Sequence, residues 1–207
     1  MTSRATVAGN LYNKYESENI IARVLMRRFL QAFDRLLDDV KPQTILEVGC
    51  GEGYLSARLA DRFSDARTCA LDISAEVLQQ AIARCAPRCT FVQASALCLP
   101  FADKEFDLVV CVETLEHLPE PDAALNEIKR VCRHRVLVSV PREPIWRLLN
   151  MARGAYLKEL GNTPGHIQHW SLGRFLRLLH THFPRVPAVA TPLPWAMAIC
   201  EVDNYAG

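Results

Sequence analysis

The chain has 207 residues, a length that suits one α/β domain with a full core. Half of the residues are hydrophobic and the formal net charge is +1, so bulk charge does not indicate a nucleic-acid-binding protein. No apolar run reaches the ~18 residues of a membrane span, and residues 1–10 lack the apolar stretch of a signal peptide.

The eight cysteines are scattered rather than arranged as a disulfide or metal framework. Several fall in predicted core elements, where free thiols behave as small hydrophobic side chains. Cys85 and Cys89 form the only close pair, and they lack partners at metal-ligand spacing. We therefore expect a reducing compartment, the cytoplasm, and a single domain over residues 1–207.

Residues 1–41 are expected to form an N-terminal helical cap. A polar stretch that holds Tyr15 comes first, and apolar residues then recur at helical spacing from Ile21 to Leu36. Pro42 follows the end of this pattern, where a proline can stop a helix. The stripe predicts an amphipathic helix that covers one face of a sheet.

Three glycines, Gly49, Gly51 and Gly53, separate an apolar run at 44–48 from a helical pattern that follows them directly. This order predicts a strand, a tight turn and a helix N-terminus, which is where open α/β sheets bind nucleotide-like ligands. A dinucleotide fingerprint would need its third glycine at position 54, where the chain has Tyr54. The spacing therefore disfavours a nicotinamide dinucleotide.

With Glu47 at the end of the strand, the pattern becomes E-x-G-x-G-x-G. It resembles motif I of the class I S-adenosylmethionine (SAM)-dependent methyltransferases. A carboxylate suits the positive charges of SAM, whereas it would repel a pyrophosphate. The resemblance implies that Gly49, Cys50 and Gly51 cradle the methionine end of SAM, with Glu47 near its ammonium group. It also implies that the N-terminal segment folds over the cofactor, so that Tyr15 either contacts the ligand or lies on the surface of a loose arm.

The second predicted strand carries a candidate for the ribose. Thr68 to Leu71 leads into Asp72, about 20 residues past the glycines, where a carboxylate can accept two ribose hydroxyls. Asp72 could instead support the helix predicted at 75–86, which Ser74 would cap. Ile73 would lie against the face of the adenine.

A third predicted strand at 90–93 leads into A-S-A-L-C-L-P-F at 94–101, which resembles the family segment G-D-A-x-x-L-P-F. The resemblance places Ser95 and Ala96 at the rim of the adenine. Ser95 stands where family members commonly have an aspartate, and a serine lacks the charge-assisted hydrogen bond of a carboxylate.

A fourth strand is predicted at 106–112, because a continuous apolar run is typical of a strand covered on both faces. The following E-T-L-E-H-L-P, at 113–119, resembles the corresponding segment of small-molecule methyltransferases related to the ubiquinone-biosynthesis enzymes. The last cofactor contact that we predict is Val112, at the end of this strand. The segment lacks the Asp/Asn/Ser-Pro-Pro-Tyr/Phe tetrapeptide of amine-directed nucleic-acid methyltransferases, which argues against a nucleic-acid acceptor. A helix is predicted at 121–132.

A fifth strand is predicted at 135–140, and an insertion at 142–170 then separates it from a helix that Ser171 caps. Apolar residues at helical spacing predict a helix from Ile145 to Leu160 inside the insertion. We interpret the insertion as the wall of an acceptor site. Its apolar face favours an acceptor with a hydrophobic body.

The C-terminal residues supply two more strand candidates, at 186–189 and 195–202, on either side of a proline-rich turn. Strands and helices alternate before them, which is typical of a parallel sheet. The expected fold is therefore Rossmann-like α/β: a seven-stranded, mostly parallel sheet with helices on both faces and a C-terminal antiparallel hairpin.

Candidate general bases lie in two places. Glu113, Glu116 and His117 follow the fourth strand, at the carboxyl edge of the sheet. His117 could act as a base, pack beside its leucine neighbours or contact the cofactor. His166 and His169 lie in a later loop flanked by glycine and proline, which should give His166 little role in the core. An imidazole, with an ordinary pKa near 6.5, suits the removal of a proton from a hydroxyl acceptor.

The side chains predicted to contact the substrate are Tyr15, Trp146, His169 and Trp170. The pair His166-x-x-His169 could in principle hold a metal ion, but no third ligand is evident, so we predict no metal. The predicted function is a SAM-dependent methyltransferase for a small-molecule acceptor. Two alternatives stay open, namely a SAM-binding partner subunit without catalysis and a nicotinamide-dependent oxidoreductase.

Overall fold

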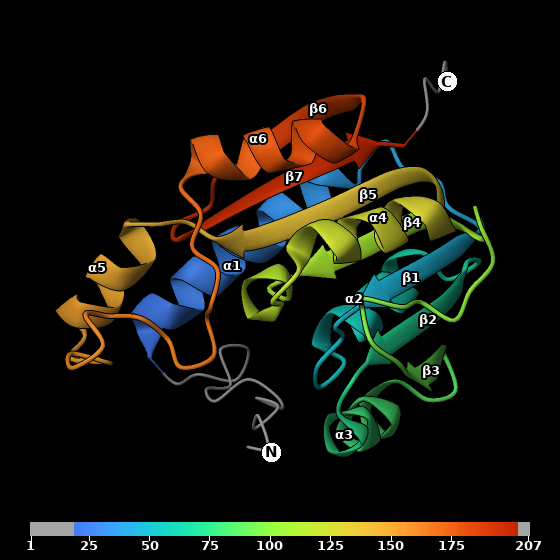
Figure 1. Ribbon diagram of the computed structural model, residues 1–207. Coiled ribbons are helices and arrows are strands. Elements are labelled where there is room, and N and C mark those ends of the chain that lie inside the picture. The colour runs from blue at the N-terminus through green and yellow to red at the C-terminus, as the bar shows by residue number, and fades with distance from the viewer. Residues whose placement is uncertain (1–18, 203–207) are drawn as a thin grey trace, which may run out of the picture.

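The computed structural model describes residues 19–202, and their seven strands form one sheet with the order β3-β2-β1-β4-β5-β7-β6. Figure 1 shows this sheet as a twisted central layer between helices. The strands are β1 (Thr44–Val48), β2 (Arg67–Asp72), β3 (Cys89–Gln93), β4 (Phe106–Val112), β5 (Cys132–Pro141), β6 (Arg185–Ala190) and β7 (Trp195–Glu201). The helices are α1 (Ile20–Leu36), α2 (Tyr54–Arg62), α3 (Ala75–Cys85), the single 3₁₀ turn η1 (Leu115–His117), α4 (Pro121–Val131), α5 (Ile145–Ala152) and α6 (Leu172–His182).

The first five strands are parallel, and β7 runs antiparallel to both β5 and β6. The predicted fold class, with its C-terminal antiparallel hairpin, is therefore confirmed. Because parallel strands end on the same side, the loops after β1 to β5 meet at one edge of the sheet. We call this side the carboxyl edge.

The two faces of the sheet are covered by different helices. In β4, Leu108 and Val110 belong to a buried cluster with α1 and α2, whereas Val109 and Cys111 belong to a second cluster with α4 and α6. Strand β4 is buried on both faces, which explains why its sequence is a continuous apolar run. This doubly covered sheet is a rigid support for the loops at its carboxyl edge.

The predicted N-terminal helix is confirmed as α1, which begins after Asn19. The Asn19 side chain accepts hydrogen bonds from the backbone N–H groups of Ile21 and Ala22, at 2.8 and 3.2 Å, and so caps the helix. Phe29 of α1 packs edge-on against Trp195 of β7, with ring centroids 4.9 Å apart. Helix α1 therefore covers the antiparallel side of the sheet (Figure 1).

The helix predicted from Ile145 to Leu160 is wrong in its second half, because α5 ends at Ala152. Gly154 follows with a positive φ of 73°, and the chain turns back. Gly161 then lies against α5, where an added Cβ would overlap the carbonyl of Arg147, and its own carbonyl accepts a 2.8 Å hydrogen bond from Asn150 Nδ2. Helical spacing cannot reveal this return of the chain, because a contact between distant residues creates it.

The insertion 142–170 leaves and rejoins the sheet at one point. Arg142 pairs with Trp170 as an isolated parallel bridge, and Glu143 N donates to Trp170 O at 2.9 Å. Figure 1 shows α5 standing beyond the carboxyl end of β5, near the first turns of α1. Within residues 19–202, no helix combines the length and the apolar character that a membrane crossing requires.

Candidate active site at the carboxyl edge

The glycine turn begins where β1 ends, next to the end of β2. The N–H groups of Gly49 and Cys50 both donate to Leu71 O at 2.9 Å. The φ angles of Gly49, Gly51 and Gly53 are 75°, 54° and 80°, a region that favours glycine over residues with a Cβ. The sequence-based prediction of a strand, a tight turn and a helix N-terminus is confirmed.

The three glycines meet different surroundings. An added Cβ at Gly49 would overlap Thr114, and one at Gly53 would lie 2.9 Å from Ala81 on α3. At Gly51, no atom of the described residues lies within 4 Å of such a Cβ. Gly49 and Gly53 are thus required by internal packing, whereas Gly51 leaves its backbone open to a ligand.

Thr114 was missed by the sequence analysis. Its hydroxyl lies 3.1 Å from Val112 O and 3.3 Å from Val48 O, so it bridges the ends of β4 and β1 while it fills the space beside Gly49. The available signal was its place directly after the fourth strand, but the contact with Gly49 depends on the pairing of β1 with β4.

Glu47 lies at the end of β1 with only 3% of its surface exposed. The pKa of its carboxyl group is raised to about 8, mainly by burial and to a smaller extent by the negative charge of Asp72, whereas a hydrogen bond from Ser56 Oγ lowers it. A cationic group nearby would favour the ionised carboxylate. The residue present therefore fits the ammonium of SAM, and Ser56 is a further partner that sequence reasoning missed.

Asp72 holds the glycine turn through its side chain. Its Oδ2 accepts a hydrogen bond from Gly51 N and its Oδ1 accepts one from Ser74 N, both at 3.0 Å. Ser74 Oγ caps α3 by accepting from Val77 N at 3.3 Å. The structural role that the sequence left open is therefore present. Each carboxylate oxygen keeps a second lone pair, so the contact with ribose hydroxyls stays a prediction that the geometry allows.

The predicted adenine residues lie next to Asp72. Ile73 is 51% exposed directly after β2, and Ala94 N donates to Asp72 O at 3.1 Å, which brings the segment after β3 alongside. Ser95 Oγ accepts a 3.2 Å hydrogen bond from Leu97 N. Ala96, Val112 and Cys50 are buried around this edge. Burial raises the pKa of the Cys50 thiol, so it stays protonated and contributes by packing.

The two groups of candidate bases come together in the structure. Glu116 and His117 lie on η1, and His166 approaches them from the insertion, so that one ligand atom from each lies within 4.8 Å of the others. The rings of His117 and His166 meet edge to face, with centroids 4.9 Å apart. We call these three residues the Glu-His-His cluster. Its assembly could not be seen in the sequence, because 49 positions separate the two histidines.

His166 is only 8% exposed, so the expectation that it has little role in packing is wrong. Its ring stacks on Trp146 of α5, with centroids 5.6 Å apart and an interplanar angle of 29°. Trp146 Nε1 donates to Thr163 Oγ1 at 2.9 Å, and this bond fixes the indole. Trp146, a predicted substrate residue, therefore also orients His166.

The other predicted residues are more dispersed. His169 is half-buried and is not part of the Glu-His-His cluster, and Trp170 lies in the core cluster shared by β5 and α6. Glu113, at a φ of 54°, accepts hydrogen bonds from Trp195 Nε1 at 2.7 Å and from Ser139 Oγ at 3.3 Å, so it links the ends of β4, β5 and β7. Tyr15 lies outside the described residues.

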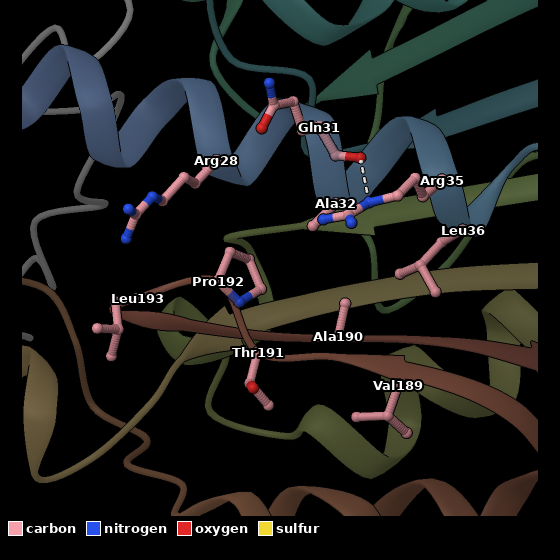
Figure 2. Close-up of a pocket in the computed structure, with 10 residues that line it drawn as sticks. All are labelled: Arg28, Gln31, Ala32, Arg35, Leu36, Val189, Ala190, Thr191, Pro192 and Leu193. Carbon is pink, nitrogen blue, oxygen red and sulfur yellow. Dashed lines mark hydrogen bonds between the residues drawn. The ribbon is translucent and has the colours of Figure 1, made fainter.

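A separate groove of about 720 Å³ lies between α1 and the turn after β6 (Figure 2). Figure 2 shows Arg28 and Arg35 of α1 on one side and Thr191, Pro192 and Leu193 on the other. Strand β6 is four strands away from β1 in the sheet, which corresponds to roughly 19 Å at ~4.8 Å per strand. The groove shares no lining residue with the glycine turn or with the Glu-His-His cluster.

Comparison with known proteins agrees with this geometry. Residues 45–135 match a family model described as a methyltransferase domain. A malonyl-[acyl-carrier protein] O-methyltransferase from Geobacter sulfurreducens is 35% identical over 120 residues, which are 56% of this chain and 44% of that protein. A fatty-acid O-methyltransferase from Mycolicibacterium smegmatis is 39% identical over 100 residues, which are 46% of this chain and 35% of that protein. The chain thus spans less than half the length of these relatives.

Solved structures share the fold. A putative methyltransferase from Haloferax volcanii, solved with a methyltransferase activator, superposes with a TM-score of 0.71 at 17% identity over 88% of this chain and 93% of that one. Magnesium protoporphyrin IX methyltransferase from Synechocystis, solved with bound S-adenosylhomocysteine (SAH), gives 0.66 at 17% identity over 89% and 88%. Together with the strand order and the E-x-G-x-G-x-G turn, these findings support the resemblance to the class I S-adenosylmethionine-dependent methyltransferases, whose domain residues 45–135 match.

Proposed function

We propose that the chain transfers the methyl group of SAM to an oxygen atom of a small-molecule acceptor with a hydrophobic body. The observation that carries this proposal is the Glu-His-His cluster, which lies at the same edge of the sheet as the open glycine turn. The names of two relatives, a fatty-acid and a malonyl-[acyl-carrier protein] O-methyltransferase, support an oxygen acceptor.

Bound SAM supplies an electrophilic methyl group on a sulfonium, which is already a good leaving group. The chain must therefore mainly position the acceptor and exclude water, and orientation alone can contribute ~7–11 kcal/mol. In the proposed site, Gly51 lets the cofactor approach the backbone, Asp72 binds the ribose and Glu47 faces the ammonium. Ile73 and Ser95 contact the adenine.

A hydroxyl acceptor has to lose a proton, and the imidazoles of His166 and His117 are our candidates to accept it. His117 Nδ1 lies 3.0 Å from Gly165 O. Because a carbonyl can only accept, Nδ1 carries the hydrogen, and Nε2 of the neutral ring is the nitrogen that can accept a proton. General-base help of this kind is worth roughly 10²–10⁴-fold. An acceptor that is already ionised, such as a carboxylate, would need no base.

The hydrophobic body of the acceptor is inferred from the insertion. On α5, Leu148 and Leu149 are 55% and 38% exposed, and Leu157 and Leu160 are exposed on the following turns. Exposed apolar groups gathered on one segment are typical of a binding surface. Trp146 and the adjacent loop to Trp170 would form the wall nearest to the imidazoles.

The cysteines support a proposal on location, and the segment at 113–119 supports a proposal on the class of acceptor. All eight cysteines are free, and most of them are buried, which supports a reducing compartment such as the cytoplasm. We propose a small molecule rather than a nucleic acid as the acceptor, because the segment at 113–119 lacks the tetrapeptide of amine-directed nucleic-acid methyltransferases.

The test measures methyl transfer from radiolabelled SAM to two acceptors with the same alkyl chain, one a phenol and one a carboxylic acid. For the phenol, His166→Ala should lower turnover by roughly 10²-fold while SAH affinity stays within about twofold. For the carboxylate the loss should be much smaller. His180→Ala, on the exposed side of α6, is the matched control. Methylation of neither acceptor by the wild type, or equal activity of the His166 variant on the phenol, would refute the proposal.

A further inference from the structure

Two imidazoles and one carboxylate converge at the acceptor side, from segments that are far apart in the chain. Candidate ligand atoms of Glu116, His117 and His166 all lie within 4.8 Å of one another. Two histidines with one carboxylate are a frequent ligand set for Zn²⁺ and for other divalent transition metals. The pair His166-x-x-His169 suggested by spacing is not the arrangement that the fold builds.

The backbone holds this convergence in place. Ile167 N and Gln168 N both donate to Glu116 O, at 2.9 and 3.1 Å, and Gln168 Nε2 donates to Leu118 O at 3.2 Å. Asn162 Nδ2 donates to His166 O at 3.2 Å. The segment after His166 is thus attached to the backbone of η1 and Leu118, and Asn162 holds the His166 carbonyl from within the loop, without the use of the three cluster side chains.

The two rings are also oriented. The Gly165 carbonyl fixes the hydrogen of His117 on Nδ1, which leaves Nε2 as the coordinating atom, and a backbone carbonyl is a common second partner for metal-binding histidines. Trp146 stacks on the ring of His166 and limits its rotation. Preset tautomers and ring planes lower the cost of ordering the ligands around an ion.

We propose that the Glu-His-His cluster binds one divalent transition-metal ion of the Zn²⁺ type, with an open coordination position for an acceptor oxygen. Tetrahedral zinc holds its ligands about 3.4 Å apart, so side-chain rotations that move ligand atoms by about 1 Å would close the site. The charge of the ion would balance the buried Glu116 carboxylate, which is only 1% exposed. Three protein ligands and one open position are typical of catalytic rather than structural zinc sites.

The catalytic consequence rests on the proposed function, whereas the binding of the ion does not. An acceptor hydroxyl that coordinates the ion releases its proton to solvent, and the oxygen lone pair forms the new bond to the methyl carbon. The carbon–sulfur bond breaks with its electron pair going to sulfur, so the donor becomes a neutral thioether. In this state the imidazoles act as ligands and not as bases.

The test uses the full chain, stripped with a chelator and titrated with Co²⁺ as a visible probe and with Zn²⁺ by calorimetry. We expect one equivalent of either ion, and the intense visible absorption of low-coordinate cobalt. Glu116→Gln and His166→Asn should each weaken binding by at least about tenfold. His169→Asn and the exposed-histidine control His180→Asn should bind like the wild type.

Thermal unfolding and SAH titration of each variant distinguish a lost ligand from a lost fold, and His166→Asn serves if Glu116→Gln does not fold. Less than half an equivalent of metal in the wild type would overturn the inference, as would equal losses in the His169 and His180 variants. Metal binding without SAH binding would refute the proposed function and leave the metal site standing. If the chain binds no ion and still transfers the methyl group, the metal site is refuted and the proposed function stands.

Discussion

Asp72 is expected to have two roles that a single substitution would remove together. Asp72→Ala deletes the acceptors for Gly51 N and Ser74 N, so the ligand-free protein should lose stability. Two half-buried hydrogen bonds to a charged acceptor are together worth about 2 kcal/mol after allowance for solvent. In a chain of this size, that loss corresponds to a fall in Tm of roughly 4–8 °C.

The effect on the cofactor should be larger. Loss of the proposed ribose bonds should cost about 2–3 kcal/mol, which is a 30- to 150-fold weaker SAH affinity. Asp72→Asn keeps one carbonyl oxygen and should fall between the wild type and Asp72→Ala. Calorimetry with SAH and a thermal melt of the same samples measure both quantities.

Ser74→Ala is the matched control, because it removes the cap of α3 but leaves the Asp72 carboxylate in place. Loss of the cap should cost about 1 kcal/mol, or a Tm lower by roughly 2–4 °C, with SAH affinity within about twofold. If Asp72→Ala lowers the Tm as predicted but binds SAH as well as Ser74→Ala does, the carboxylate is purely structural and the ribose assignment fails.

Three further predictions concern the cofactor side. The pKa of Glu47 is about 8 in the folded chain and near 4.5 when unfolded, so the folded state binds more protons between about pH 5 and 8, and stability should fall as pH rises through this window. Denaturation of Glu47→Gln should show a flatter pH dependence, and an equal slope would contradict it. Gly51→Val should abolish SAH binding, whereas Gly154→Val, with a similar positive φ and open surroundings, should bind normally; equal losses would point to general strain. Ser95→Asp can keep the bond from Leu97 N and offer its other oxygen to adenine, so calorimetry should show up to about tenfold tighter SAH binding, and weaker binding would show that adenine is held differently.

The cofactor side could be predicted from the sequence because its signals are local. Strand, glycine turn and helix follow one another within about 20 residues, and Asp72 lies at the end of the next strand as predicted, whereas its bond to the ribose stays a prediction. What spacing could not assign was the reason for each glycine. Gly49 and Gly53 accommodate Thr114 and Ala81, which depends on strand pairing and helix packing.

The acceptor side was less predictable because its contacts are non-local. The apolar period from Ile145 to Leu160 is real, but the chain reverses after Ala152 to place Gly161 on α5. His166 looked like a residue of an exposed polar loop, but it is buried beside His117, where the bonds from Ile167 N and Gln168 N to Glu116 O hold the loop. No pattern within the loop indicates which distant carbonyl it will meet.

Thr114 connects the two sides of the site. Its side chain fills the space beside Gly49, and the next residue begins η1, which carries Glu116 and His117. The glycine turn, Glu116 and His117 are therefore set relative to each other by one packed threonine and a single 3₁₀ turn. Methyl transfer depends on the distance between donor and acceptor, and losses of about 10²-fold can follow a shift of 1 Å. A short, packed connection at this point is what such a requirement favours, and it explains why Gly49 has no room for a side chain.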